Sequence, residues 1–116
     1  MSVTANISDV PLAAAGLTVT TLRRSGSTWV DIQGEADIAT FHQLRAGLAT
    51  ANVDGARLVH LHLFQLRFAD LASVRELGAF TDELQLTGHR VVVCGASRVV
   101  VHVACFLDFD PALWRY

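Results

Sequence analysis

The first part of the chain has the hydrophobic pattern of two strands. LTVTTLRR over residues 17–24 alternates in part between apolar and polar positions, and TWVDIQG over residues 28–34 alternates cleanly. Alternation with a period of two buries one face of a strand, and the SGS between the two segments is a turn sequence. The pattern therefore predicts a hairpin of two antiparallel strands at the start of the domain.

Two later segments have the spacing of amphipathic helices. The apolar stripe of the first consists of Phe41, Leu44, Leu48 and Ala51. The stripe of the second consists of Leu71, Val74, Leu77 and Leu84. We expect Asp37 and Asp70 to be the N-caps of these helices, because each aspartate precedes its stripe, and TGH at 87–89 to end the second helix.

Apolar runs between and after these helices predict further strands. RLVHLHLFQL at 57–66 is short and continuously apolar apart from His60 and His62, which is typical of a buried central strand with both histidines on one face. RVVVCG at 90–95 predicts the next strand. These strands and the helices between them favour a small mixed sheet.

The last part of the chain is ambiguous. VVVHVACFL at 99–107 is rich in β-branched residues, which favour a strand, whereas Ser97 in front of it has the character of a helix N-cap. The tail DFDPALWRY predicts a turn and then a short edge segment anchored by Trp114 and Tyr116.

Taken together, the elements predict a single α/β domain over residues 17–116, in which helices pack on a small mixed sheet. A chain of 116 residues is large enough to bury a core of its own. We expect residues 1–16 to be a partly ordered lead-in to the first strand. They lack the basic start of a secretory signal.

Composition narrows the function classes. The longest apolar runs, such as VVVC at 91–94, fall far short of the roughly 18 residues that cross a bilayer, so we expect a soluble cytoplasmic protein without a membrane partner. The formal net charge is −2 and the arginines are scattered, which argues against nucleic acid as a partner. The chain has no lysine for Schiff-base or P-loop chemistry, and no nucleophile accompanied by a base can be recognised. We therefore expect no enzyme activity.

The spacing of the cysteines and histidines predicts neither a redox motif nor a metal site. Cys94 and Cys105 do not form a CxxC motif and lie among valines, so we expect both to be buried and reduced. His60 and His62 share a strand face, but the sequence shows no third ligand at metal spacing. No metal and no cofactor are therefore expected. His62 could instead donate a hydrogen bond to Asp70.

Three segments together resemble the STAS domain, the module of sulfate transporters and anti-sigma-factor antagonists. They are GEADIATFHQLRAGL, LVHLHLFQLRFADLASVREL and the VVVCG strand. The most specific feature is G-E-x-D before the first helix combined with L-x-F-x-D before the second. The resemblance covers about residues 17–116 and implies the STAS fold and a protein-binding function.

In the antagonists of that family the second motif continues Asp-Ser-Ser-Gly, and an anti-sigma kinase phosphorylates the second serine. Position by position, Asp70 keeps the aspartate, Leu71 and Ala72 replace the serines, and Ser73 replaces the glycine. His62 stands where the family often has another aspartate. The resemblance thus implies a phosphorylation position that has degenerated to Ala72.

The resemblance places the partner-binding surface in the two loops before the helices. The candidate residues are Glu35, Asp37, Asp70, Leu71, Ala72, Ser73 and Arg75. The implied partner is an anti-sigma factor or a related kinase. The Ser73 hydroxyl is expected to bond back to Asp70 as part of the cap.

Two alternatives to a simple antagonist stay open at this point. The domain could be a small-molecule or redox sensor that uses the two histidines or the two cysteines. It could also be a non-switching subunit of a larger STAS assembly, and the sequence leaves a homodimer open.

Overall fold

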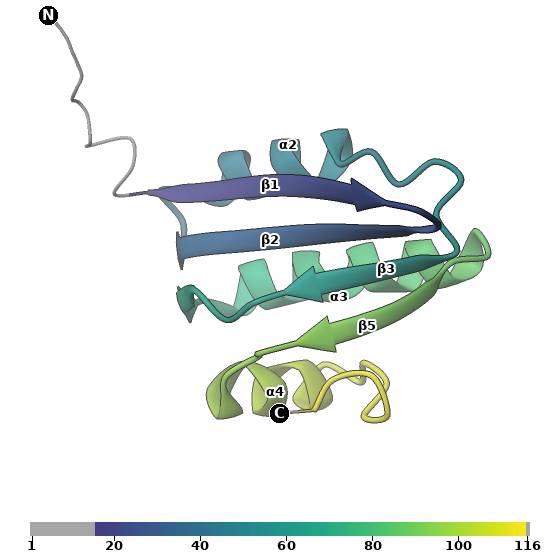
Figure 1. Cartoon of the computed structure of the whole chain (residues 1–116). Helices are drawn as coiled ribbons and strands as arrows, with labels where there is room; N and C mark the ends of the chain where they lie inside the picture. Colours follow the sequence, from purple (N-terminus) through teal and green to yellow (C-terminus); the bar gives the residue numbers. More distant parts are fainter. Residues whose placement is uncertain (1–15, 116) are drawn as a thin grey trace, which may run out of the picture.

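The computed structural model describes residues 16–115, which form a five-stranded mixed sheet and three helices (Figure 1). In chain order the elements are β1 (Leu17–Arg24), β2 (Ser27–Ala36), α2 (Phe41–Thr50), β3 (Leu58–His62), β4 (Leu66–Ala69), α3 (Leu71–Leu86), β5 (Arg90–Cys94) and α4 (Arg98–Phe106). The predicted α/β fold class is confirmed. The expectations for residues 1–15 and for Tyr116 lie outside the described residues.

The predicted hairpin is confirmed. β1 and β2 pair antiparallel from Leu17 opposite Gly34 to Arg24 opposite Ser27. The turn between them contains Gly26, whose φ of +74° is a conformation that glycine adopts without strain. Alternate residues of β2 are buried, as the period of two requires.

The sheet continues with parallel strands in the order β1-β2-β3-β5. β4 pairs with β2 as well, beyond the point where β3 ends. The prediction of one strand over residues 57–66 is therefore wrong. The chain turns after Leu63, where the Leu66 N–H donates to the Leu63 carbonyl at 3.1 Å, and then pairs with β2 again.

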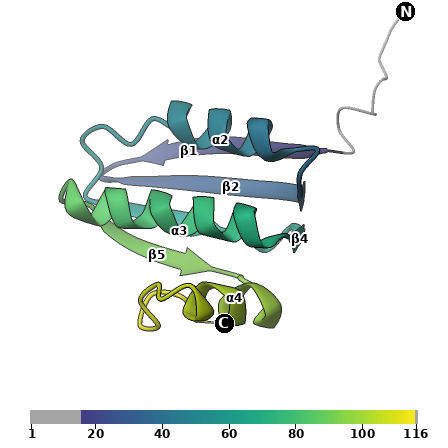
Figure 2. The ribbon, with the colours of Figure 1, turned by 180° about the vertical axis from the view of Figure 1, so that it is seen from behind.

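Helices α2 and α3 pack on one face of the sheet, and α4 lies beside β5 at its edge (Figures 1 and 2). The core between sheet and helices includes Val30, Ile32, Val59, Leu61, Leu44, Leu48, Val74, Leu77 and Leu84, all buried. No described helix covers the opposite face. We call it the open face, and the strand register places on it Thr20, Leu22, Trp29, Asp31, His60, His62, Val92 and Cys94.

The starts of the three helices test the sequence predictions about them. Ser97 accepts the Val100 N–H at 3.2 Å, so the ambiguous segment is the helix α4. Burial of the apolar face of this amphipathic helix outweighs the preference of its valines for a strand. The first helix begins later than predicted, at Phe41, so Asp37 is not its N-cap. α3 begins directly after Asp70 and ends before TGH, as expected, with Gly88 at φ +96°.

The described part of the C-terminal tail, up to Arg115, does not form the predicted edge strand. Within the described residues it makes turns after α4, and Trp114 is the anchor, with 1% of its surface exposed. The ring of Phe109 lies so close to Gly78 of α3 that a Cβ there would overlap it. The tail is thus packed against α3 as part of the domain. None of the described helices is long and apolar enough to span a membrane.

Candidate functional site

The two loops that carry the candidate residues lie side by side at one edge of the sheet. β2 and β4 are parallel, with Ala36 opposite Ala69, so the loops that follow them leave the sheet together. The Asp70 N–H donates to the Ala36 carbonyl at 2.9 Å and joins the two loops directly. The structure therefore brings together the segments 35–37 and 70–75.

The loop from β2 to α2 is fixed by a reciprocal pair of side chains. The Asp37 carboxylate accepts the N–H groups of Ala39 at 3.0 Å and of Thr40 at 3.2 Å. The Thr40 hydroxyl accepts the Asp37 N–H at 3.0 Å and donates to the Glu35 carbonyl at 2.7 Å. Asp37 therefore holds the loop rather than the helix, in the manner of a capping box one turn early. Thr40 was missed from the sequence, although its spacing of three from Asp37 was the available signal.

The start of α3 presents some of the candidate residues and buries another. Asp70 is the N-cap, and its carboxylate accepts the Ser73 N–H at 2.9 Å. Leu71, Ala72 and Arg75 are exposed. Ser73 is fully buried, and its hydroxyl has no hydrogen-bond partner among the described residues. The expected bond from this hydroxyl to Asp70 is therefore wrong, because the third helical position faces the core.

Removing the Asp70 carboxylate is expected to destabilise the start of α3. Asp70→Ala loses the acceptor for the Ser73 N–H, and lost N-caps typically cost about 0.5–2 kcal/mol of stability. The free energy of unfolding from urea titration measures this cost. Asp70→Asn, which keeps an acceptor oxygen at the cap, should retain most of the stability. Equal losses in both variants would contradict the capping role.

Large apolar side chains are exposed around these loops. Ile38 is 88% exposed, Phe68 52% and Leu71 49%. Glu35 and Arg67 form an ion pair at 3.7 Å, with both side chains largely in solvent, so it contributes little to stability. We call this surface the docking end and define it as Glu35, Ile38, Phe68, Leu71, Ala72 and Arg75. Ile38 and Phe68 were not among the candidate residues from the sequence, although the L-x-F-x-D motif contains Phe68 and was an available signal for it.

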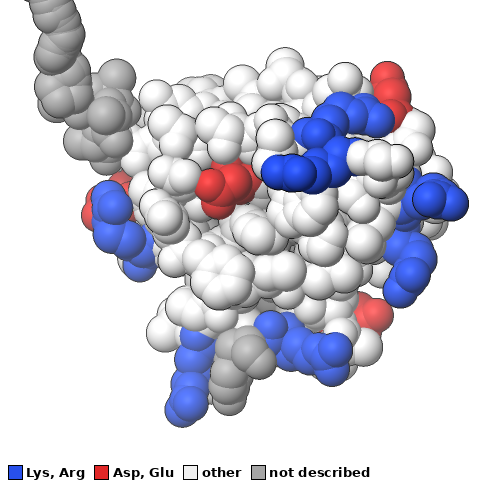
Figure 3. Space-filling model, viewed as in Figure 1, with Lys and Arg blue, Asp and Glu red and all other residues white. Residues whose placement is uncertain are grey.

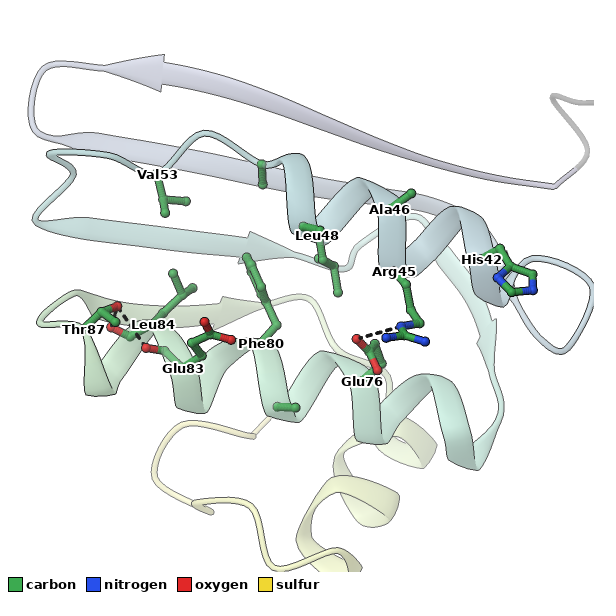
Figure 4. A pocket seen from close by; sticks show the side chains of 13 residues that line it. His42, Arg45, Ala46, Leu48, Val53, Glu76, Phe80, Glu83, Leu84 and Thr87 are labelled. Carbon is green, nitrogen blue, oxygen red and sulfur yellow. Dashed lines mark hydrogen bonds and ion pairs between the residues drawn. The ribbon is translucent and has the colours of Figure 1, made fainter.

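A groove runs between α2 and α3 (Figure 4). Its volume is about 570 Å³. Arg45 of α2 and Glu76 of α3 face each other across it at 3.8 Å, and Leu48 and Phe80 line its apolar part. The hydroxyl of Thr87 in its lining donates to the backbone carbonyls of Glu83 at 2.9 Å and Leu84 at 3.1 Å.

His60 and His62 share one face of β3, as their spacing predicted, and that face is the open face. His62 makes no hydrogen bond to Asp70 among the described contacts. Instead its ring meets the ring of Phe64 edge-on, with centroids 5.7 Å apart. Cys94 lies beside both histidines, which corrects the expectation that no third ligand is present. The prediction of two buried cysteines is also wrong, because Cys94 is half-buried and Cys105 is exposed, although both are free thiols.

Burial shifts two pKa values in this cluster. Partial burial, and secondarily the neighbouring His62, lower the pKa of His60. Burial raises the pKa of the Cys94 thiol. At neutral pH both groups are therefore held in their uncharged forms.

Comparison with known proteins gives matches among solved structures alone. No protein-family model and no curated protein sequence matches the chain. An anti-sigma factor antagonist from Mycobacterium paratuberculosis superposes with a TM-score of 0.66 and 21% identity, over 84% of this chain and 85% of the other. The antagonist SpoIIAA in its unphosphorylated form gives 0.62 and 23%, over 84% of each chain. The STAS domain of an antisigma-factor antagonist from Rhodobacter sphaeroides gives 0.61 and 19%, over 72% of this chain and 95% of the other.

The chain has the STAS fold. SpoIIAA, which shares this fold, has been solved in both an unphosphorylated and a phosphorylated form. In the STAS fold of this chain, the docking end combines the end of β2, the end of β4 and the start of α3.

Proposed function

We propose that the protein is a cytoplasmic, non-enzymatic regulatory module of the anti-sigma-factor antagonist type, which binds its protein partner through the docking end and is not switched by phosphorylation there. The observation that carries this proposal is the start of α3. Ala72 occupies an exposed position two residues after the cap Asp70, and the neighbouring Ser73 is fully buried.

The absence of a switch follows from access to hydroxyl groups. A kinase must bring a hydroxyl oxygen in line with the γ-phosphate of ATP. Ala72 has no such oxygen, and the hydroxyl of Ser73 is enclosed by protein. The other hydroxyl in these loops belongs to Thr40, which is 7% exposed and already bonded to the Glu35 carbonyl. Neither described loop therefore offers a kinase an accessible acceptor.

The docking end has the composition of a protein-binding surface. Exposed Phe68, Leu71 and Ile38 supply apolar area that a partner can bury, and Glu35 and Arg75 supply charges at the margin. An apolar centre with a polar rim is the usual anatomy of an interface. The STAS neighbours are antagonists of anti-sigma factors, so the partner that we propose is an anti-sigma factor or a related kinase.

The proposal predicts a complex with the partner kinase that does not dissociate when ATP is added. Each anti-sigma kinase of the source organism is mixed with the protein, and the dissociation constant is measured with ATP and with a non-hydrolysable analogue. We expect equal constants for the binding kinase, and intact mass without added phosphate. Ala72→Ser, which restores an exposed hydroxyl, is the matched control and should gain phosphate and lose affinity. Stoichiometric phosphate on Ser73 of the unaltered protein would overturn the proposal.

The size of the complex separates the simple antagonist from a subunit of a larger STAS assembly and from a homodimer. Size-exclusion chromatography with light scattering gives the mass of the protein alone and with its partner. A small complex with one partner supports the antagonist. A large complex with other STAS proteins would identify a non-switching subunit of an assembly, and a doubled mass of the protein alone would identify a homodimer.

A further inference from the structure

Two imidazoles and one thiol meet on the open face of the sheet. The ligand atoms of His60, His62 and Cys94 all lie within 4.8 Å of one another. The meeting follows from the sheet: β3 and β5 are parallel, and their register sets His62 opposite Cys94, with His60 two residues before on the same face. We propose that these three residues bind a zinc ion, independently of any partner at the docking end.

The donor set fits zinc. Zinc takes imidazole nitrogen and thiolate sulfur, and sites with three protein ligands keep a fourth position for water. Tetrahedral bonds of about 2.0 Å to nitrogen and 2.3 Å to sulfur place ligand atoms roughly 3.3–3.6 Å apart. The observed separations of up to 4.8 Å exceed this spacing by little more than about 1 Å, so the three side chains have to draw together by that amount when a metal binds.

Aromatic neighbours hold the two imidazoles in place. Trp29 stacks on His60 with ring centroids 4.4 Å apart and an angle of 3° between the planes. Phe64 packs edge-on against His62, and its own ring covers Gly95, where a Cβ would overlap it. Because both imidazoles are packed before a metal binds, little side-chain freedom is lost on binding.

The surroundings leave room for a fourth ligand. A hollow of about 760 Å³ borders the site and is lined by Trp29, Asp31 and His62 among others. Asp31 lies opposite His62 on the neighbouring strand, and its carboxylate accepts a hydrogen bond from Gln33 at 2.7 Å. The pairing places Asp31 on the same face of the sheet as His62. Figure 3 looks onto this side and shows mostly uncharged surface, with an acidic group near the middle, basic side chains reaching across the upper part and further basic groups at the edges.

Cobalt is the probe for the experiment, because tetrahedral Co²⁺ bound to a thiolate has a charge-transfer band in the near ultraviolet and strong visible bands. The full chain, reduced with a phosphine, is titrated with Co²⁺ and then with Zn²⁺. We expect the bands to saturate at one equivalent and to vanish when Zn²⁺ displaces Co²⁺. Cys94→Ser should abolish the charge-transfer band and weaken Zn²⁺ binding at least about 100-fold, since even outer-shell changes cost 10–100-fold.

Matched variants make the result specific. Cys105→Ser removes the other, exposed thiol, and His42→Asn removes an exposed imidazole of α2, and both should keep the bands and the affinity. His62→Gln should lose the tetrahedral visible bands. Circular dichroism of each metal-free variant shows that it is folded. Absence of the charge-transfer band in the unaltered protein, or its survival in folded Cys94→Ser, would overturn the proposal and would show that His60, His62 and their aromatic neighbours merely pack together.

Discussion

Replacing Ala72 with aspartate is expected to weaken partner binding by about 2–5 kcal/mol while the melting temperature stays unchanged or rises. Ala72 is exposed in the first turn of α3, directly after the cap Asp70. A negative charge there meets the positive end of the helix dipole, which stabilises a helix by about 0.3–1 kcal/mol. In a docked surface the same carboxylate would lose its water without gaining a partner, and that cost exceeds the helix gain.

Calorimetric titration with the partner and a thermal melt together test this variant. Ala112→Asp adds the same charge at an exposed alanine of the tail and should leave affinity unchanged, so it controls for net charge. Unchanged affinity of Ala72→Asp would rule out docking through this position. A lowered melting temperature would mean instead that Ala72 packs in the folded core.

The second large effect is expected at the C-terminal tail, where Trp114→Ala should lower the free energy of unfolding by about 3–5 kcal/mol. The Trp114 side chain is 1% exposed, and its ring lies 6.5 Å from that of Phe109, which in turn covers Gly78 of α3. The backbone N–H of Trp114 donates to the Asp110 carbonyl at 2.9 Å, and truncating the side chain leaves this bond in place. Truncating the indole therefore opens a cavity beneath the tail and releases its hold on α3.

Urea unfolding followed by circular dichroism measures this loss. Trp114→Phe should cost clearly less, because it keeps most of the apolar volume and removes an indole N–H that is buried without a partner among the described residues. The neighbouring Arg115 is exposed, so Arg115→Ala should change stability by no more than about 0.5 kcal/mol. A stability of Trp114→Ala equal to that of Arg115→Ala would mean that the tail is not part of the core.

The parts of the fold that rest on local patterns could be predicted from the sequence. The hairpin β1–β2 follows from alternation and a glycine turn, and α3 follows from an apolar stripe behind Asp70. In these segments the residues that determine the structure are neighbours in the chain. Propensity, capping and burial therefore all favour the same element.

The errors occur where the structure depends on distant partners. The apolar run 57–66 reads as one strand, but β4 forms after a turn because the end of β2 offers it a second parallel pairing. The expected edge strand near Trp114 is absent from the described tail, because the tail packs on α3 instead. Nothing in the local sequence indicates either partner.

The candidate site could be predicted only in part, again because some of its features depend on contacts between distant segments. Asp70 could be recognised as a cap from its position, but the burial of Ser73 depends on how α3 is rotated against the sheet. The approach of Cys94 to His62 depends on the register between β3 and β5, which no spacing in the sequence reveals. The exposure of Ile38 and Phe68 depends on how the two loops leave the sheet, which the apolar character of these residues does not indicate.

The described helices cover one face of the sheet and leave the other open, and this difference has an evolutionary consequence. Positions such as Val30 and Leu61 are locked between sheet and helices, so most substitutions there are removed by loss of folding. Positions such as Trp29, His60 and His62 alternate with them along the same strands but face away from the helices. Substitutions on the open face can therefore accumulate during evolution while the fold is retained. New binding chemistry can arise there without disturbing the inherited loops at the sheet edge.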